Sequence, residues 1–316
     1  MSLPTLSVTL PNYNHASYVA EALEAILAQS VRPLEVAVID DASMDNSVEI
    51  IQEFVRQDPI VTLVKNEHNK GGVVNVNRHL ARALGEYHYT AASDDKVLPG
   101  FFEKSLELLA KYPQAGLCCS DYVTFDTEKG IVAENALRLC DHPCYISPAQ
   151  LVEIMKDRPI HIAGATAIVK KNAIIEAGTY LTELKWHCDW FVFLVIAFRY
   201  GICYIPEKLA AIRVVPCSLS SSGTKKHDSQ RQVLSTMLNL LKSPRYRDVF
   251  PLFKQSGALS IFRLKMLSAI LSSRSQWDHL SPILVRRTLH LATRSALSHI
   301  LPMSIRTKCR ALCKAT

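Results

Sequence analysis

Short apolar runs alternate with amphipathic stretches through the first 125 residues of the chain. β-branched, continuously apolar runs of this kind predict strands, and they lie at 6–10, 34–39, 61–64 and 87–92. The intervening segments repeat apolar residues every three to four positions and predict helices at 18–28, 48–55 and 74–84. Because strands alternate with helices, we expect a parallel sheet covered on both faces and joined by right-handed crossovers.

The pattern becomes less regular after residue 116. Further strands are predicted at 118–123, 162–169 and 203–205, and a helix is predicted at 188–199. We expect these strands to form a second, mixed sheet region that packs on the first. The serine-rich break at 218–223 predicts a boundary between an α/β unit of residues 1–222 and a helical extension of residues 223–316.

The charge is distributed unevenly along the chain. The 316 residues carry a net charge of +7, yet residues 225–316 hold 17 Lys and Arg against 3 Asp and Glu, while residues 1–224 hold 19 against 26. A composition with 48% hydrophobic and 21% charged residues is that of a folded globular chain. An acidic unit joined to a strongly basic segment indicates that the segment meets phosphate, in lipid headgroups or in nucleic acid.

The basic extension contains an amphipathic helical pattern. Its apolar face would comprise Val285, Leu289, Ala292, Ala296 and Ile300, with arginines opposite. Two interpretations stay open: attachment to an anionic membrane surface, or packing on the α/β unit with a solvated basic face. Nucleic acid is not expected as a partner, because Trp277 is the only Trp after residue 218 and stacking aromatics are scarce.

The cysteines and the N-terminus bear on the compartment. The chain has nine cysteines without a Cys-x-x-Cys pair, and no signal-peptide pattern precedes them. This pattern predicts reduced thiols, no disulfides and a cytoplasmic protein. Peripheral attachment to the inner face of the cytoplasmic membrane stays an open alternative. No apolar run approaches the ~20 residues of a membrane span. A zinc site at Cys140, His142 and Cys144 is a minor alternative, since no second ligand pair accompanies them.

Polar residues follow three of the predicted strands directly. They are Pro11–Asn14, Asp40–Asp45 and Ser93–Asp95. In a parallel sheet, ligands lie beyond the carboxyl ends of the strands, and two neighbouring acidic pairs would repel unless a cation lay between them. A divalent cation bound to a diphosphate meets that need, so we expect a nucleoside diphosphate compound. No Gly-x-Gly-x-x-Gly and no Walker sequence is present.

At these positions the chain resembles the family 2 glycosyltransferases, inverting enzymes of the GT-A fold that act on sugar nucleotides. The matching segments are LSVTLPNYN (6–14), VIDDASMD (38–45), NKGG (69–72) with Asn77, GEY (85–87), SDDKVLPG (93–100), WHCDW (186–190) and residues 206–220. The resemblance implies an α/β GT-A fold with a mostly parallel Rossmann-like sheet, a smaller mixed sheet and a C-terminal helical extension. It also implies a nucleotide-binding part at about 1–125 and an acceptor-binding part at 126–222.

The resemblance also implies roles for individual residues. Asp189 matches the base that activates the acceptor, and Asp94 and Asp95 match the acidic motif that holds Mg²⁺ or Mn²⁺. The candidates for binding the donor, which include Asp94 again, are Pro11, Asn12, Tyr13, Asp41, Asn69, Gly71, Asn77, Ser93, Asp94 and Arg213. Arg213 is a candidate for the diphosphate because a guanidinium donates two parallel hydrogen bonds.

Together these features predict metal-assisted transfer of a sugar, most plausibly from a UDP-sugar, to a hydroxyl of a glycan or lipid-linked glycan in surface polysaccharide or lipopolysaccharide synthesis. Ala92, Cys188 and Val215 stand where many members carry Asp, Glu and His. These departures keep a non-catalytic sugar-nucleotide-binding or scaffold protein open as the alternative. A nucleotidyltransferase is the weaker alternative, because its Gly-rich, Arg-bearing loop is absent after Leu10.

Overall fold

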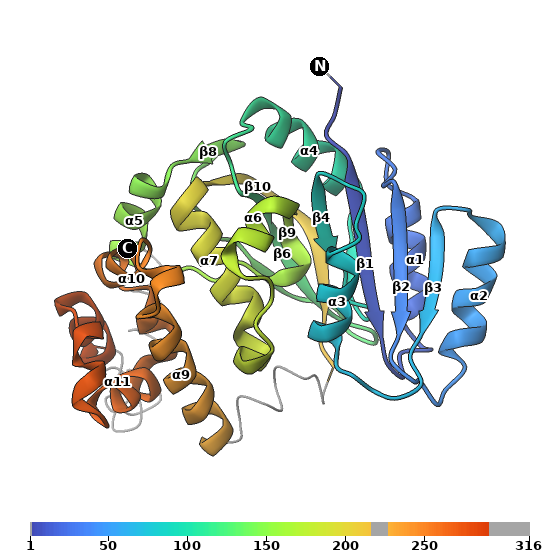
Figure 1. Cartoon of the computed structure of the whole chain (residues 1–316). Coiled ribbons are helices and arrows are strands. Elements are labelled where there is room, and N and C mark those ends of the chain that lie inside the picture. Colours follow the sequence, from blue (N-terminus) through green and yellow to red (C-terminus); the bar gives the residue numbers. More distant parts are fainter. Residues whose placement is uncertain (1, 216–226, 291–316) are drawn as a thin grey trace, which may run out of the picture.

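The computed structural model of the chain describes residues 2–215 and 227–290. A single ten-stranded sheet runs through the molecule, with helices on both of its faces (Figure 1). Its strands are β1 Leu6–Asn12, β2 Glu35–Asp40, β3 Val61–Lys65, β4 Tyr87–Thr90, β5 Lys96–Val97, β6 Leu117–Asp126, β7 Gly130–Asn135, β8 Cys144–Ile146, β9 Ala167–Lys170 and β10 Ile202–Arg213. The predicted alternation of strand and helix over the first 92 residues is confirmed.

The helices connect these strands and continue beyond them. Up to residue 200 the α-helices are α1 Val19–Leu27, α2 Ser47–Gln57, α3 Gly72–Leu80, α4 Phe101–Lys111, α5 Pro148–Asp157, α6 Lys171–Ala177 and α7 Cys188–Tyr200. The C-terminal ones are α9 His227–Leu241, α10 Phe250–Ser256 and α11 Arg263–Leu271. Short 3₁₀ helices are η1 Gly164–Thr166, η2 Thr182–His187, η3 Pro244–Tyr246, η4 Ala258–Phe262 and η5 Arg274–His279.

The sheet differs from the prediction in one respect. Its main order is β3-β2-β1-β4-β9-β6-β10-β5, with β7 paired to β6 and β8 paired to β10. Because β9 is antiparallel to both β4 and β6, it joins the parallel N-terminal strands to the parallel pair β6 and β10. The mixed strands therefore extend the first sheet and do not form a separate smaller one. The α/β class and the largely parallel sheet are as predicted.

Two hydrophobic cores lie on opposite faces of this sheet. Successive residues of a strand point to opposite faces, so Leu117 and Cys119 of β6 belong to one core and Cys118 to the other. Helices α1, α2 and α4 cover the second core, whereas α3, α5, α6 and α7 cover the first. Strands buried on both faces are continuously apolar, which is why their sequences are so readily recognised.

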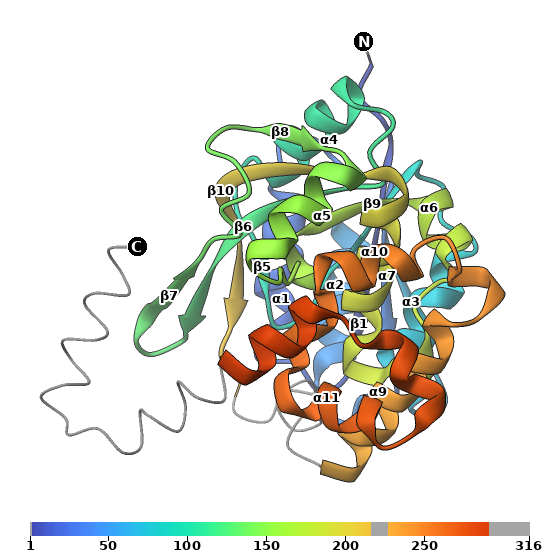
Figure 2. The same ribbon diagram turned by 90° about the vertical axis from the view of Figure 1, so that its left-hand side faces the viewer.

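The C-terminal helices pack on the body of the molecule beside α5 and α7 (Figures 1 and 2). Val233, Leu234, Met237 and Leu238 of α9 are buried in the same core as Phe191 of α7. Residues 227–290 therefore share the interior of the α/β unit. The predicted boundary at 222/223 falls within residues 216–226, outside the described ranges, as does the predicted amphipathic helix from residue 291 onward.

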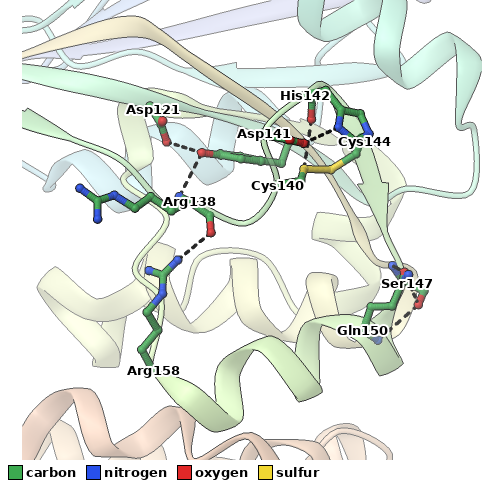
Figure 3. The surroundings of a disulfide bond; sticks show 10 residues. Asp121, Arg138, Cys140, Asp141, His142, Cys144, Ser147, Gln150 and Arg158 are labelled. Atoms are coloured by element: carbon green, nitrogen blue, oxygen red, sulfur yellow. Dashed lines mark hydrogen bonds and ion pairs between the residues drawn. A yellow bond between two sulfur atoms is a disulfide. The ribbon is translucent and has the colours of Figure 1, made fainter. Parts of the chain in front are cut away.

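A disulfide joins Cys140 and Cys144, so the prediction of no disulfides was wrong (Figure 3). The chain reverses through Asp141, His142 and Pro143, which brings the two sulfur atoms together. Cysteine spacing carries no information about such a local reversal. Because both sulfurs are bonded to each other, the zinc site at this loop is excluded as well. The other described cysteines, Cys118, Cys119, Cys188 and Cys203, are free thiols as predicted, and all four are buried.

Across residues 2–215 and 227–290, no helix combines the length and the hydropathy that crossing a bilayer requires.

Two histidines meet beneath the carboxyl end of the sheet. The Thr9 hydroxyl lies 2.6 Å from His79 Nδ1 and 2.7 Å from His88 Nε2, and His79 Nε2 is 3.7 Å from a Glu35 carboxylate oxygen. Burial lowers the pKa of His88 to about 3, with His79 and Lys171 adding to the effect. Both rings are therefore neutral in the folded protein at neutral pH.

We expect the protein to lose stability as the pH falls below about 6.5. The His88 pKa is lower in the folded state than in the unfolded chain, so the unfolded chain binds the extra proton and is favoured in acid. The loss approaches about 1.4 kcal/mol per pH unit for this one group. In urea unfolding, the free energy of unfolding should differ less between pH 7 and pH 5 for His88→Gln than for wild type. His68→Gln, at an exposed position, is the control; an equal pH dependence in all three proteins would contradict the assignment.

Candidate functional site

The predicted ligand-binding loops meet at one edge of the sheet. Strand β1 pairs in parallel with β2 on one side and β4 on the other, with Asn12 opposite Asp40 and Thr9 opposite Thr90. The carboxyl ends of all three strands therefore point to the same edge, where α/β sheets bind ligands. The loops after β1 and β4 are joined directly, since His15 Nδ1 lies 2.6 Å from the Ser93 hydroxyl.

Asp41 is the most strongly held carboxylate of this edge. Its Oδ1 accepts from the Lys70 amide and the Asn66 side chain, each at 2.8 Å, and its Oδ2 accepts from the Gly71 amide at 2.8 Å. Burial alone would raise the pKa of Asp41, but these hydrogen bonds, together with Asn75, lower it below its usual value. The carboxylate is thus ionised and fixed in direction.

Part of the support for Asp41 comes from residues that were not predicted. Asn66 donates to both Asp41 and Asn75 Oδ1 through its Nδ2, and it accepts from Arg78 at 3.1 Å. Asn66 directly follows β3, so the reasoning applied to the other strand ends would have identified it. A carboxylate can accept about four hydrogen bonds, and Asp41 receives three, which leaves one lone pair on Oδ2 for a ligand.

Asn12 occupies the end of β1 beside Asp41. Its Nδ2 donates to Asp40 at 2.9 Å, while its buried Oδ1 has no hydrogen-bond partner among the described residues. Asp40 also accepts from the Ser43 amide at 3.0 Å, so Asp40 stabilises the loop. The next residue, Tyr13, is 41% exposed and leaves its ring accessible for stacking. The edge therefore presents an aromatic face together with two free acceptors, on Asn12 and Asp41.

The acidic pair Asp94–Asp95 lies in the loop between β4 and β5. Asp95 Oδ1 accepts from the Arg213 amide at 2.8 Å, and no described residue donates to the Asp94 carboxylate. Burial, and then the charge of Asp94, raise the pKa of Asp95 to about 7. A buried carboxylate of raised pKa beside a second carboxylate is suited to a divalent cation, which would balance the charge of both.

The protein supplies only part of a metal coordination sphere at this pair. Among residues 2–215 and 227–290, no group of three His, Cys, Asp or Glu side chains is arranged to hold a metal ion. Mg²⁺ and Mn²⁺ sites that act on diphosphates commonly use one or two carboxylates and complete the shell with phosphate oxygens and water. The residues at Asp94 and Asp95 therefore fit a cation that binds with the nucleotide.

Arg213 is enclosed by partners from three segments. Its Nε donates to the Asp94 carbonyl at 2.9 Å, Nη1 donates to Thr127 at 2.7 Å, and Nη2 forms an ion pair with Glu21. The guanidinium also lies over the rings of Tyr18 and Phe125, at 4.7 and 4.3 Å. In this arrangement Arg213 braces the acidic loop, and a diphosphate could bind it only by replacing one of these partners.

Asp189 lies in the first turn of α7, next to Gly164 of η1. Its Oδ1 accepts from the Trp190 amide at 2.7 Å, and a Cβ built on Gly164 would lie 3.2 Å from its Oδ2. Burial raises the pKa of Asp189, and His161 and the Trp190 amide offset only part of this effect. A carboxylate whose pKa is raised by burial is a stronger proton acceptor once it is ionised.

Strand β4 links the two sets of acidic residues. The Tyr89 hydroxyl donates to the Ala165 carbonyl of η1 at 3.1 Å, next to Gly164, and Thr90 donates to the Tyr180 hydroxyl at 3.5 Å. The same strand leads into the loop that carries Asp94 and Asp95. Strand β4 thus leads into the Asp94–Asp95 loop and also contacts the segments around Asp189.

Other predicted donor-binding residues make contacts within the protein. Asn77 donates to the Tyr180 carbonyl at 2.7 Å and accepts from the Tyr180 amide at 3.1 Å, and Asn69 Oδ1 accepts from the Gly71 amide at 3.1 Å. Gly71 has φ = 91°, a conformation that favours glycine, and this conformation lets its amide reach Asp41. Donor contacts for Asn69, Asn77 and Ser93 stay predictions.

Three comparisons with known proteins bear on this site. GlyG, a glycosyltransferase of Streptococcus pneumoniae, is 35% identical over 126 residues, 40% of this chain and 41% of GlyG. TuaG of Bacillus subtilis, provisionally named a teichuronic acid biosynthesis glycosyltransferase, is 35% identical over 106 residues, 34% of this chain and 42% of TuaG. The chain therefore matches only about two fifths of the length of these relatives.

Two solved structures share the fold at low sequence identity. TarS of S. aureus, solved with UDP, superposes with a TM-score of 0.59 at 16% identity over 85% of this chain and 72% of that one. The mannosyltransferase PcManGT of Pyrobaculum calidifontis, solved with GDP-Man and Mn²⁺, superposes with a TM-score of 0.60 at 19% identity, over 97% of this chain and 83% of that one. These likenesses confirm the GT-A fold.

The family model described as "Glycosyl transferase family 2" matches residues 7–164. This segment contains the strand ends, Asp41 and the Asp94–Asp95 pair, whereas Asp189 and Arg213 lie beyond it. Since the matched segment is half of the chain and carries the site described above, the chain belongs to the family 2 glycosyltransferases.

Proposed function

We propose that the protein transfers a sugar from a nucleoside diphosphate donor to an acceptor hydroxyl, with inversion at the anomeric carbon. The observation that supports this most directly is the arrangement around β4. Strand β4 leads into the loop of Asp94 and Asp95, and its Tyr89 hydroxyl donates to the Ala165 carbonyl of η1, whose neighbour Gly164 lies against the Asp189 carboxylate.

The nucleoside would bind at Asp41, Asn12 and Tyr13. The free lone pair of Asp41 Oδ2 and the unpartnered Oδ1 of Asn12 are both acceptors, so they suit a base or ribose that offers N–H or O–H groups. The exposed Tyr13 ring suits stacking on the base. We propose a uridine nucleotide. Because fold neighbours were solved with UDP and with GDP-Man, both classes belong in the test.

Asp94 and Asp95 would hold Mg²⁺ or Mn²⁺, which as a Lewis acid neutralises the charge of the departing diphosphate. Arg213 keeps the loop of this pair in place through its amide and guanidinium contacts.

Asp189 would act as the general base. A sugar hydroxyl is a weak nucleophile, and a positioned carboxylate that accepts its proton typically contributes 10²–10⁴-fold to the rate. As the O–H proton moves to Asp189, the acceptor oxygen forms a bond to the anomeric carbon. The bond from that carbon to the diphosphate oxygen breaks, and its electron pair leaves with the nucleotide. Attack from the face opposite the leaving group inverts the configuration.

We propose that the acceptor is a glycan or a lipid-linked glycan of the cell surface. The name of TuaG, which refers to teichuronic acid biosynthesis, supports this class of acceptor for a related sequence. A synthetic saccharide library, with and without a lipid carrier, would identify which hydroxyl accepts the sugar.

The donor site can be tested by calorimetric titration with UDP and with GDP, each with and without Mn²⁺. We expect Mn²⁺-dependent binding of UDP, followed by turnover of a UDP-sugar and an inverted anomeric configuration in the product. Binding of a sugar nucleotide without any turnover, to acceptor or to water, would instead favour the non-catalytic alternative.

We also propose that the C-terminal helices contact an anionic membrane surface. On α11, Leu264 and Leu271 are seven residues apart and therefore share one helix face; they are 54% and 55% exposed. The exposed residues Arg263 and Arg274 flank this face, and Trp277 of η5 is 47% exposed. Exposed leucines and a tryptophan among cations are typical of a helix that lies in a lipid headgroup layer.

Flotation with lipid vesicles tests this surface. Wild type should float with vesicles that contain phosphatidylglycerol and much less with phosphatidylcholine alone, and Leu264→Asp/Leu271→Asp should lose this difference. Leu84→Asp, at a position 69% exposed before β4, is the matched control and should float like wild type. Truncation at residue 223 is unsuitable, because it would uncover the core shared with α7. Equal flotation of all variants would refute membrane docking by α11.

A further inference from the structure

The chain enters the helix of Asp189 through an irregular turn. Lys185 has φ = 49° and ψ = −120°, which interrupts η2 just before α7. His187 stands at the N-cap of α7, but its side chain accepts from no amide of the first turn; there the Trp190 amide donates to Asp189 instead. A non-glycine residue at positive φ and an N-cap residue without a capping hydrogen bond are both unfavourable by themselves, so contacts from elsewhere must hold this turn.

Gln230 of α9 supplies such contacts. Its Oε1 accepts from the Trp186 indole Nε1–H at 2.8 Å, and its Nε2 lies 3.0 Å from His187 Nε2. Gln230 itself is only 3% exposed. A buried amide that bonds two consecutive side chains fixes the direction of both, and these are the residues immediately before Cys188 and Asp189.

The protonation state of His187 agrees with this network. Burial lowers the pKa of His187 to about 4, and the contact with Gln230 offsets part of the effect. The ring is therefore neutral at neutral pH. With its proton on Nδ1, His187 accepts from Gln230 Nε2–H through Nε2, and the Gln230 carbonyl stays free to accept from Trp186.

Aromatic side chains from the C-terminal helices complete the support. The ring of Phe262 of η4 packs edge-on against both His187 and Trp190, with centroid distances of 4.8 Å to each. Phe253 of α10 lies 6.1 Å from Trp190. The residues on both sides of Asp189 are thus held by the C-terminal helices, while Gly164 of the α/β unit closes the opposite side.

From this arrangement we infer that the C-terminal helices complete the active site, with Gln230 as a positioning residue that orients Asp189 through Trp186 and His187. The inference rests on the proposed role of Asp189 as the base. It assigns a catalytic purpose to a segment outside residues 7–164, the part of the chain that the family model matches.

The test compares Gln230→Met with Gln232→Met. Methionine keeps the length of glutamine but removes its hydrogen bonds, and Gln232 is exposed on the same helix. Hydrogen exchange measured by mass spectrometry should become faster across residues 182–192 in Gln230→Met only. Turnover of the sugar nucleotide identified by the donor screen, with water or saccharide as acceptor, should fall by about ten- to a hundred-fold in kcat, because a misplacement near 1 Å has effects of this size. The donor KM and UDP affinity should stay unchanged.

Two further variants separate hydrogen bonding from packing. Gln230→Glu keeps an acceptor for Trp186 and should recover part of kcat. Trp186→Phe removes the indole N–H, and the double variant with Gln230→Met should be little worse than either single variant, since both changes break one interaction. Additive losses would contradict the inference.

The outcomes distinguish this inference from the proposed function. Unchanged exchange over 182–192, or faster exchange with unchanged kcat, would overturn the role of Gln230 even if Asp189→Asn is inactive. A wild-type protein that turns over no sugar nucleotide would overturn the proposed function, and the exchange measurement would still decide whether Gln230 orders the turn. A general loss of structure would lower UDP affinity too, and Gln230→Glu then provides the decisive comparison.

Discussion

Asp189→Asn is expected to lower turnover by about a thousand-fold while UDP affinity stays within two-fold of wild type, a loss within the usual range for a general base. Asparagine preserves the shape of the side chain and an oxygen that accepts from the Trp190 amide, so α7 should start as before. What the variant loses is the ability to accept a proton from the acceptor. Single-turnover measurement with saturating donor separates this chemical step from product release.

The pH dependence provides a second measurement on the same variant. Burial raises the pKa of Asp189, so wild-type turnover should increase with pH until this group is ionised. The residual turnover of Asp189→Asn should not show this increase with pH. Glu183→Gln is a suitable control, because Glu183 is an exposed acid six residues earlier. If Asp189→Asn retained a tenth or more of wild-type turnover, another group would have to be the base.

Asp95→Asn is expected to abolish the Mn²⁺-dependent part of UDP binding and to stabilise the metal-free protein. Asparagine Oδ1 can still accept from the Arg213 amide, so the loop keeps its conformation while one of the two charges is removed. Because burial and Asp94 raise the pKa of Asp95 to about 7, the folded protein binds a proton that the unfolded chain does not. Wild type without metal should therefore lose stability as the pH rises from about 4 through 7.

Thermal melts in EDTA at pH 8 would test the second half of this prediction. The Asp95→Asn protein should melt at a higher temperature than wild type, while saturating Mn²⁺ and UDP should stabilise wild type alone. Glu107→Gln, at an exposed position on α4, should change neither property. Unimpaired Mn²⁺-dependent binding in Asp95→Asn would remove this residue from the metal site.

The positions of the candidate donor-binding residues could be predicted because these residues follow apolar strands directly. The carboxyl ends of parallel strands meet by geometry, so Asn12, Asp41 and Asp94–Asp95 were brought to one edge by the order of strands alone. The same reasoning, applied to β3, would have found Asn66. Helix α4 was also recognisable in principle, since Phe101, Phe102, Leu106 and Leu109 recur at helical spacing.

Other features depend on contacts between distant segments and could not be predicted. Gln230 meets Trp186 and His187 from more than forty residues away, and no local pattern marks it. The direction of β9 is set by its pairing with β4 and β6, because the pattern of a short apolar run does not distinguish a parallel strand from an antiparallel one. The Cys140–Cys144 bond depends on how a single loop reverses.

The unbroken sheet has a mechanical consequence. Since β9 is hydrogen-bonded to β4 on one side and to β6 on the other, the N-terminal strands and the pair β6 and β10 are not separate bodies joined by a hinge. Closure over a substrate cannot proceed by rotation of one half against the other without rupturing this ladder. Adaptation to ligands of different size is then confined to the loops beyond the strand ends, while β4 keeps its contacts with both the Asp94–Asp95 loop and η1 beside Asp189.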